Sequence, residues 1–196
     1  MYERESEDFV VQADKQTSGK GRKNRSWESP PGNLYFSLCT EKTSLLPLRA
    51  SVAVAQSLED IGISPSLKWP NDVIVDEKKI CGILTEVIDG NGIIGIGLNV
   101  RSAPIEGSIC ISDLLDTEVS LDKLMKEILS NFYDIKDVLK TYRNYSSTVG
   151  EKVKIKTVNG DFKGIVADID EKGRLVLESG KKFISGDVIH LREDTI

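Results

Sequence analysis

The chain of 196 residues is poor in the side chains that metal centres and disulfide frameworks require. Its one histidine is His190, and its three cysteines, Cys39, Cys81 and Cys110, follow no disulfide or metal-ligand spacing. A zinc site would therefore lack ligands, and a Cys-His or Ser-His-Asp mechanism would depend on His190 alone. We expect the cysteines to be small buried or half-buried residues.

Long apolar runs are also missing. No run approaches the ~20 residues that cross a membrane, and residues 1–5 (Met-Tyr-Glu-Arg-Glu) have no signal-peptide character. The net charge of −5 argues against a general nucleic-acid or anionic-membrane surface. The sequence therefore predicts a cytoplasmic protein without a DNA or membrane partner.

Alternating and helical apolar patterns predict an α+β fold. Strands are expected at residues 8–13, 33–40, 67–69, 73–75, 79–88 and 93–100. Residues 89–92 (Asp-Gly-Asn-Gly) predict a tight hairpin, so we expect mostly antiparallel pairing. One helix should follow Pro47 and stop at Gly62, and a second, amphipathic helix should run from Ser120 to Leu139 and pack on the sheet.

The composition changes after Ser147. From Gly150 onward, short alternating segments are separated by Asn-Gly, Lys-Gly and Ser-Gly pairs, which favour turns. Such strands are typical of a small barrel of about 45 residues. We therefore expect a first domain at residues 1–147 and a small barrel domain at residues 148–196.

Residues 16–27 (Gln-Thr-Ser-Gly-Lys-Gly-Arg-Lys-Asn-Arg-Ser-Trp) are the first segment with recognisable chemistry. Two glycines let backbone N–H groups approach a ligand, while Lys20, Arg22 and Arg25 concentrate positive charge. Such a loop is suited to phosphate or carboxylate oxygens. The alternative is a solvated basic loop, and the segment is not a P-loop, which needs Gly-Lys-Ser or Gly-Lys-Thr before a helix.

Residues 68–73 (Lys-Trp-Pro-Asn-Asp-Val) lie where two expected strands meet. The Trp-Pro pair restricts the backbone, and Asn71 and Asp72 offer oxygens suited to a hydrated Mg²⁺ or a ribose hydroxyl. A rigid turn, with Asn and Asp in their common turn roles, explains this segment equally well.

Two glycine-bearing strands form the third segment. Lys79 begins an otherwise apolar strand, so we expect its ammonium to be held at the end of the sheet. Gly82, Gly95 and Gly97 would weaken their strands unless something approaches the backbone closely. The pair therefore suggests a flat ligand against the sheet, and the alternative is a pair of bulges.

Together and in this order, these segments resemble the biotin protein ligase family. Residues 19–27 are similar to its Gly-Arg-Gly-Arg-x-Gly-Arg-x-Trp signature, and residues 68–72 reproduce its Lys-Trp-Pro-Asn-Asp. Residues 79–84 resemble its Lys-x-x-Gly-Ile-Leu strand, residues 95–99 its Gly-x-Gly-x-Asn, and residues 185–192 its last barrel strand. The resemblance covers nearly the whole chain.

The resemblance implies a class II synthetase-like biotin/lipoate ligase fold, a largely antiparallel mixed sheet with packed helices and a small C-terminal barrel similar to Src-homology-3 domains. It also implies a two-step ligation. Biotin's carboxylate attacks the α-phosphate of MgATP to give biotinyl-adenylate, and a lysine of a biotin carboxyl carrier protein then displaces AMP. ATP, Mg²⁺ and biotin are the expected small molecules, and a homodimer is one expected assembly.

The resemblance gives each candidate residue a role. Lys79 matches the catalytic lysine, with Arg22 and Asp72 as further catalytic residues, and Asn71 and Asp72 would organise Mg²⁺ or orient the incoming lysine. Gln16 would bind the biotin head group, and Trp27 would stack on adenine unless it is a plain core tryptophan. The other expected contacts to biotin, ATP or the adenylate are Gly19, Lys20, Gly21, Arg25, Lys68, Gly82, Gly95, Gly97, Asn99 and Arg192.

Three features depart from the family pattern. Lys20 replaces an arginine and loses its bidentate fork, and Asn24 replaces a glycine in a turn, so we expect a looser grip on the adenylate. No Ser-Thr-Asn motif, which binds the ureido ring of biotin in the family, precedes Gln16, so we expect the sequence to start inside a longer chain. No helix-turn-helix supports a DNA-binding role.

Three other functions remain open. A lipoate or octanoate ligase or transferase shares the catalytic fold, although residues 69–72 and the barrel favour biotin. A non-catalytic module that holds adenylate or carrier without turnover would suit the missing motif. An α+β domain whose barrel merely binds a partner leaves Lys79 and the basic loop unexplained.

Overall fold

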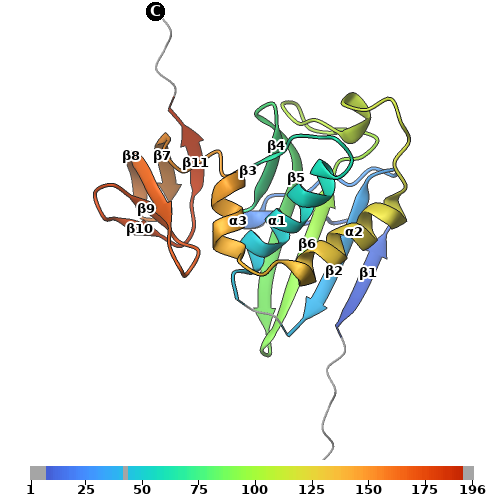
Figure 1. Cartoon of the computed structure of the whole chain (residues 1–196), viewed down its shortest axis with the longest axis horizontal. Helices are drawn as coiled ribbons and strands as arrows, with labels where there is room; N and C mark the ends of the chain where they lie inside the picture. The colour runs from blue at the N-terminus through green and yellow to red at the C-terminus, as the bar shows by residue number, and fades with distance from the viewer. Residues whose placement is uncertain (1–7, 42–43, 192–196) are drawn as a thin grey trace, which may run out of the picture.

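The computed structural model describes residues 8–41 and 44–191, which form two β-sheets and three α-helices (Figure 1). The larger sheet contains β1 (Phe9–Ala13), β2 (Leu34–Thr40), β3 (Ser66–Lys68), β4 (Asp72–Val75), β5 (Lys78–Ile88) and β6 (Asn91–Leu98). The smaller, C-terminal sheet contains β7 (Lys152–Thr157), β8 (Gly160–Ile169), β9 (Leu175–Leu177), β10 (Lys182–Phe183) and β11 (Asp187–His190). None of the helices in these ranges is long and apolar enough to cross a membrane.

The larger sheet has the strand order β1-β2-β6-β5-β4-β3, and every neighbouring pair is antiparallel. The expected strands and the hairpin between β5 and β6 are therefore confirmed. In β6, Ile94, Ile96 and Leu98 are buried, and Gly95 and Gly97 alternate with them. Because successive side chains of a strand point to opposite faces, the helix-covered face of β6 is apolar, and Gly95 and Gly97 leave the opposite face of β6 without side chains at these positions.

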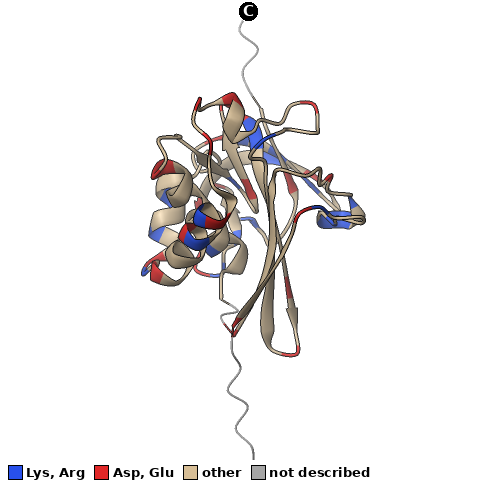
Figure 2. Cartoon of the chain, turned by 90° about the vertical axis from the view of Figure 1, so that its right-hand side faces the viewer, with Lys and Arg blue, Asp and Glu red and all other residues tan. Residues whose placement is uncertain are grey.

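Three helices cover the apolar face: α1 (Leu46–Glu59), α2 (Leu121–Asp134) and α3 (Val138–Tyr145) (Figure 2). The expected helix after Pro47 is α1, which packs directly on the strands with its valines and alanines buried. Burial of apolar area against the sheet is the main force that stabilises this layer. The cysteines are free, with Cys39 half-buried and Cys81 and Cys110 buried, as expected.

The prediction of a single helix between Ser120 and Leu139 is wrong. The chain forms two helices instead, because Ile135 leaves the helical conformation with ψ 115°. The Asp137 side chain then accepts a hydrogen bond from the backbone N–H of Lys140 and caps α3, as Ser120 caps α2. Both helices pack mainly against α1.

The C-terminal sheet is not the closed barrel that the sequence suggested. Its order is β10-β9-β8-β7-β11, and within residues 152–190 no pairing joins the edge strands β10 and β11. Residues 160–165 of β8 pair with β7, whereas Val166, Asp168 and Ile169 pair with β9, with a register shift between Val166 and Asp168. The expected short antiparallel strands are present, but within residues 152–190 they do not close into a barrel.

Two groups of contacts attach the C-terminal sheet to the rest of the protein. The Arg143 guanidinium in α3 donates to both carboxylate oxygens of Asp168, at 2.6 and 2.9 Å, and to the Ile169 carbonyl at 2.6 Å. The buried Trp69 indole donates from Nε1 to the Gly173 carbonyl at 3.0 Å. These contacts place the C-terminal sheet beside the turn that carries Asn71 and Asp72.

Candidate active site

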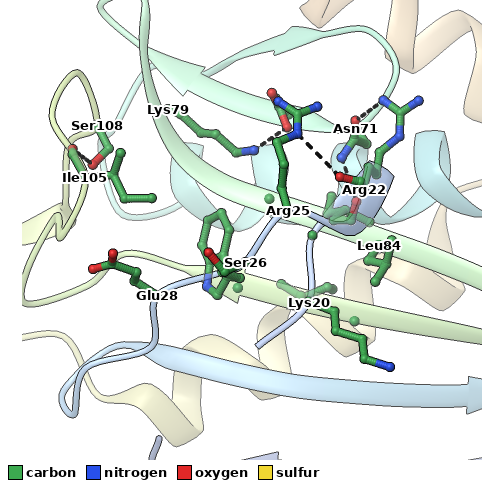
Figure 3. Close-up of a pocket in the computed structure, with 18 of the residues that line it drawn as sticks. Lys20, Arg22, Arg25, Ser26, Glu28, Asn71, Lys79, Leu84, Ile105 and Ser108 are labelled. Carbon is green, nitrogen blue, oxygen red and sulfur yellow. Dashed lines mark hydrogen bonds and ion pairs between the residues drawn. The ribbon is translucent and has the colours of Figure 1, made fainter. Parts of the chain in front are cut away.

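A cavity of about 610 Å³ lies on the face of the larger sheet that the helices leave open (Figure 3). Its floor is made by β5 and β6, and it is enclosed by residues 16–28, residues 104–108 and residues 186–188. Five cationic side chains line it: Lys20, Arg22, Arg25, Lys68 and Lys79. Every predicted site residue within residues 8–41 and 44–191 lines this cavity except Gly19, so the fold brings the three sequence segments together.

The indole of Trp27 lies against the glycines of β5 and β6. Gly82 and Gly97 face each other across the two strands. A Cβ at Gly97 would come within 2.5 Å of Trp27 Nε1, and one at Gly82 within 2.7 Å of its Cζ3. β5 and β6 keep a regular register through these glycines, and the shift between β5 and β4 lies before Gly82, so the alternative of two bulges at the glycines is wrong. The flat group that these two glycines admit is a side chain of the protein itself.

Lys79 is held by a carboxylate on the neighbouring strand. Its Nζ lies 2.6 Å from Oδ1 of Asp72 and 5.3 Å from the centre of the Trp27 ring. The backbone of Lys79 is fixed as well, because its carbonyl accepts from the Ile109 N–H at 3.0 Å. The Lys79 and Asp72 side chains are 35% and 31% exposed, so the pair is open to the cavity.

Asn71 positions Arg22. Its amide nitrogen donates to the Ile83 carbonyl at 2.7 Å, and its amide oxygen accepts from Arg22 Nη1 at 2.8 Å. Burial lowers the pKa of Arg22 while Asp187 and Asp72 oppose this change, and a guanidinium remains charged at neutral pH. Figure 3 shows Arg22, Arg25 and Lys79 gathered around Asn71, whereas the Lys20 ammonium points away from them.

The residues here do not build a metal cage. One oxygen of Asn71 accepts from Arg22, and one oxygen of Asp72 pairs with Lys79. Within the described part of the chain, no group of three or more His, Cys, Asp or Glu side chains could hold a metal ion. A divalent cation held mainly by protein oxygens would need more ligands than this.

The basic loop, residues 19–27, is closed by its own hydrogen bonds. The Gly21 N–H donates to the Arg25 carbonyl at 2.7 Å, and the Trp27 N–H donates to the Gly19 carbonyl at 2.9 Å. A Cβ on Gly19 would collide with the Trp27 carbonyl. Asn24 has a φ of 59°, so it adopts the conformation that a glycine favours, as expected.

The C-terminal sheet holds the tip of this loop. Asp187 accepts from Lys23 Nζ at 3.1 Å and from Arg25 Nη2 at 2.7 Å, and the Gly186 carbonyl accepts from Arg22 Nη1 at 3.4 Å. Burial alone would raise the pKa of Asp187, but the two cations lower it below its ordinary value. Sequence reasoning gave Asp187 no role, because only its place in the fold brings it to the loop.

Two buried polar atoms at the cavity have no protein partner. Asn99 donates from Nδ2 to the Ile109 carbonyl at 3.2 Å, but its Oδ1 accepts no hydrogen bond. Nε1 of Trp27 donates none. A buried polar atom without a partner costs roughly 1–3 kcal/mol, so a ligand that offers a donor and an acceptor here gains affinity.

The remaining predicted residues differ in how close they lie to this cluster. Gln16 lines the cavity, and its side-chain oxygen accepts from the Ser29 hydroxyl at 2.8 Å. Gly19 lines a second cavity of about 430 Å³ that shares Gln16 and Trp27 with the first. Lys68 lines the main cavity from the end of β3, and Arg192 lies outside the described residues.

Comparisons with known proteins agree with this geometry. Residues 2–100 match the model of the biotin/lipoate A/B protein ligase family, and residues 148–191 match that of the biotin protein ligase C terminal domain. The chain is 33% identical to the biotin--[acetyl-CoA-carboxylase] ligase of Mycobacterium tuberculosis, over 93% of this chain and 79% of that protein. The chain belongs to the biotin protein ligase family.

Further members of the biotin protein ligase family are similar to it. The bifunctional ligase/repressor BirA of Bacillus subtilis is 35% identical over 93% of this chain, which spans 66% of that protein. The biotin protein ligase from Aquifex aeolicus in complex with biotin and ATP has 32% identity and a TM-score of 0.79, covering 94% of this chain and 89% of that chain. This similarity confirms the expected α+β fold class.

Proposed function

We propose that the chain is an ATP-dependent ligase that attaches biotin to a lysine of a biotin carboxyl carrier protein in the cytoplasm. The observation that carries the proposal is the convergence of Lys79, Arg22 and Arg25 on a floor of glycines. A carboxylate and a triphosphate must meet there, and both are anions. Cations fixed by a folded loop and a strand lower the electrostatic cost of that encounter. The similar Aquifex aeolicus enzyme binds biotin and ATP.

In the first step, a carboxylate oxygen of biotin bonds to the α-phosphorus, and pyrophosphate leaves with the electrons of the broken P–O bond. In the second, the lysine amine of the carrier bonds to the carbonyl carbon, loses a proton, and AMP leaves. Lys79 stabilises the charge that builds on the reacting oxygens, with Asp72 fixing its ammonium. Asn71 fixes Arg22 for the same purpose. The basic loop keeps water from the mixed anhydride.

The unpaired Asn99 Oδ1 and the position of Trp27 support a nucleotide as one ligand of the cavity. Adenine stacks on Trp27, and Oδ1 of Asn99, which has no protein partner, accepts from an N–H of the ligand. Mg²⁺ would be held mainly by the triphosphate and would offset its charge, while Asn71 and Asp72 hold Arg22 and Lys79 beside it. The homodimer stays a prediction.

Biotin is favoured over lipoate by the part of the site that the C-terminal sheet contributes. Gly186 and Asp187 line the cavity, and they belong to the segment that matches the biotin protein ligase C terminal domain. Gly186 and Asp187 also accept hydrogen bonds from Arg22, Lys23 and Arg25 of the basic loop. The C-terminal sheet therefore contributes to the site itself, which an α+β domain whose barrel merely binds a partner would not require.

The test supplies the protein with MgATP, a biotin carboxyl carrier domain and either labelled biotin or labelled lipoate. We expect label from biotin alone on the carrier lysine. The Lys79→Ala variant should lose it, and Lys78→Ala, which removes the exposed neighbouring lysine of β5, should keep it. Transfer of lipoate would support the related ligase or transferase, and transfer of neither acid would support a non-catalytic binding module.

A further inference from the structure

Asp187 joins the C-terminal sheet to the basic loop. It is the first residue of β11, and each of its carboxylate oxygens accepts from a different loop residue: Oδ1 from Arg25 and Oδ2 from Lys23. The carbonyl of Lys156, the strand partner of Asp187, lies 3.5 Å from the same Lys23 Nζ. The tip of the loop thus meets a small acceptor site at the edge of the sheet.

The C-terminal sheet, which carries this acceptor site, is held in place by contacts with the rest of the protein. Arg143 and Trp69 tie the C-terminal sheet to α3 and to the turn that carries Asn71, through three hydrogen bonds to Asp168 and Ile169 and one to Gly173. The position of the Asp187 carboxylate relative to the cavity is therefore set by contacts that do not involve the loop.

The loop, in contrast, depends on outside contacts for its position. Its internal hydrogen bonds close the turn, but Lys23 and Asn24 both have positive φ, 57° and 59°, a conformation that costs free energy in residues other than glycine. The Lys23 and Arg25 side chains are 38% and 62% exposed, so burial does little to hold them. Asp187 is the group that both contact.

We propose that Asp187 is a positioning residue that holds the basic loop over the cavity before the nucleotide binds. The inference rests on the proposed function, since the ligand of the ordered loop is the triphosphate. Without Asp187, the free-energy cost of ordering the loop would reduce the affinity for ATP. The KM for ATP should then rise, while kcat, which reflects the fully assembled complex, should change little.

The experiment compares Asp187→Asn with Asp161→Asn. Asp161 is a matched control because it also lies opposite Lys156, on β8, but pairs with Lys154 and not with the loop. Hydrogen exchange of the loop amides is followed by mass spectrometry without ATP or biotin. Two exposed ion pairs predict about three- to tenfold faster exchange in Asp187→Asn, and no change in Asp161→Asn. The KM for ATP should rise by a similar factor with kcat changed less than about twofold.

Two further variants show whether the effect passes through the loop. Asp187→Glu keeps the charge and should restore most of the slow exchange. Lys23→Asn, which tolerates the positive φ, should add little to Asp187→Asn in the double variant. Exchange in Asp187→Asn equal to that in Asp161→Asn, or effects of Lys23→Asn and Asp187→Asn that multiply, would overturn the inference. Faster exchange in a protein that transfers no biotin would refute the proposed function and leave the role of Asp187 standing.

Discussion

The ammonium of Lys79 and the carboxylate of Asp72 meet at 2.6 Å across two adjacent strands that line the cavity. About a third of each side chain is exposed, so a ligand can reach both. The pair keeps Lys79 in one place and leaves the remaining N–H donors of its ammonium for reacting oxygens. Asp72 thereby acts first on Lys79, through Oδ1 of its carboxylate.

Replacing Asp72 with asparagine should therefore slow both steps. The ammonium of Lys79 would lose its charged partner and its fixed position, and a small displacement of a catalytic group costs up to about a hundredfold in rate. The measurement is a single-turnover assay that times biotinyl-AMP formation and transfer to the carrier separately. Unchanged formation with slow transfer would mean that Asp72 serves the lysine of the carrier instead.

An alanine at Gly97 should displace Trp27, because its Cβ would lie 2.5 Å from the indole nitrogen. Overpacking of this kind costs about 1–3 kcal/mol of the free energy of unfolding. Gly95 provides the control, since a Cβ there meets nothing closer than the Leu84 carbonyl at 3.7 Å. Urea unfolding and tryptophan fluorescence should change in Gly97→Ala and not in Gly95→Ala. Equal shifts in the two variants would contradict the packing of Trp27 on β6.

The two tryptophans should respond differently to replacement by phenylalanine. Trp69 donates to the Gly173 carbonyl, so Trp69→Phe leaves a partner unpaired and should cost about 1–3 kcal/mol of the free energy of unfolding. Nε1 of Trp27 has no protein partner, so Trp27→Phe should cost less stability but weaken ATP binding. Urea unfolding and ATP titration measure the two effects. A larger loss of stability in Trp27→Phe would be inconsistent with this account.

His190 predicts a loss of stability in mild acid. Burial, and next the charge of Lys68, lower the pKa of His190 in the folded protein, and its Nε2 has no partner. The unfolded chain binds the proton first, so this contribution is complete above a pH of about 6.5 and falls as the pH drops towards the folded pKa. His190→Gln should reduce the slope of unfolding free energy against pH in that window. An unchanged slope would show that His190 does not contribute.

Much of the larger sheet was predictable because its strands carry local signals. Apolar residues predicted β2 and β6, and the Asp-Gly-Asn-Gly turn predicted that β5 and β6 pair as a hairpin. The site segments were also predictable, since glycines in strands and clustered cations are unusual unless something approaches them. These patterns identified Lys79, Gly82 and Gly97 without a structure.

Other features depend on contacts between distant residues. The apolar spacing continues from Phe132 to Val138, so the sequence predicts one helix, and only the cap by Asp137 and the packing on α1 decide for two. The C-terminal sheet stays open at β10 and β11, and the turn signals that separate its strands do not predict which strands pair. Asp187 reaches Arg25 across 162 positions, a separation at which periodicity carries no information.

The measurement that tests the central claim most directly is biotin-dependent exchange of labelled pyrophosphate into ATP. It reports the first step alone and needs no carrier protein. We predict exchange in the wild-type protein. The exchange rate should fall about a hundred- to a thousandfold in Lys79→Met and should stay at the wild-type level in Lys78→Met. Wild-type protein without exchange, or Lys79→Met with wild-type exchange, would contradict the claim that this cavity activates biotin through Lys79.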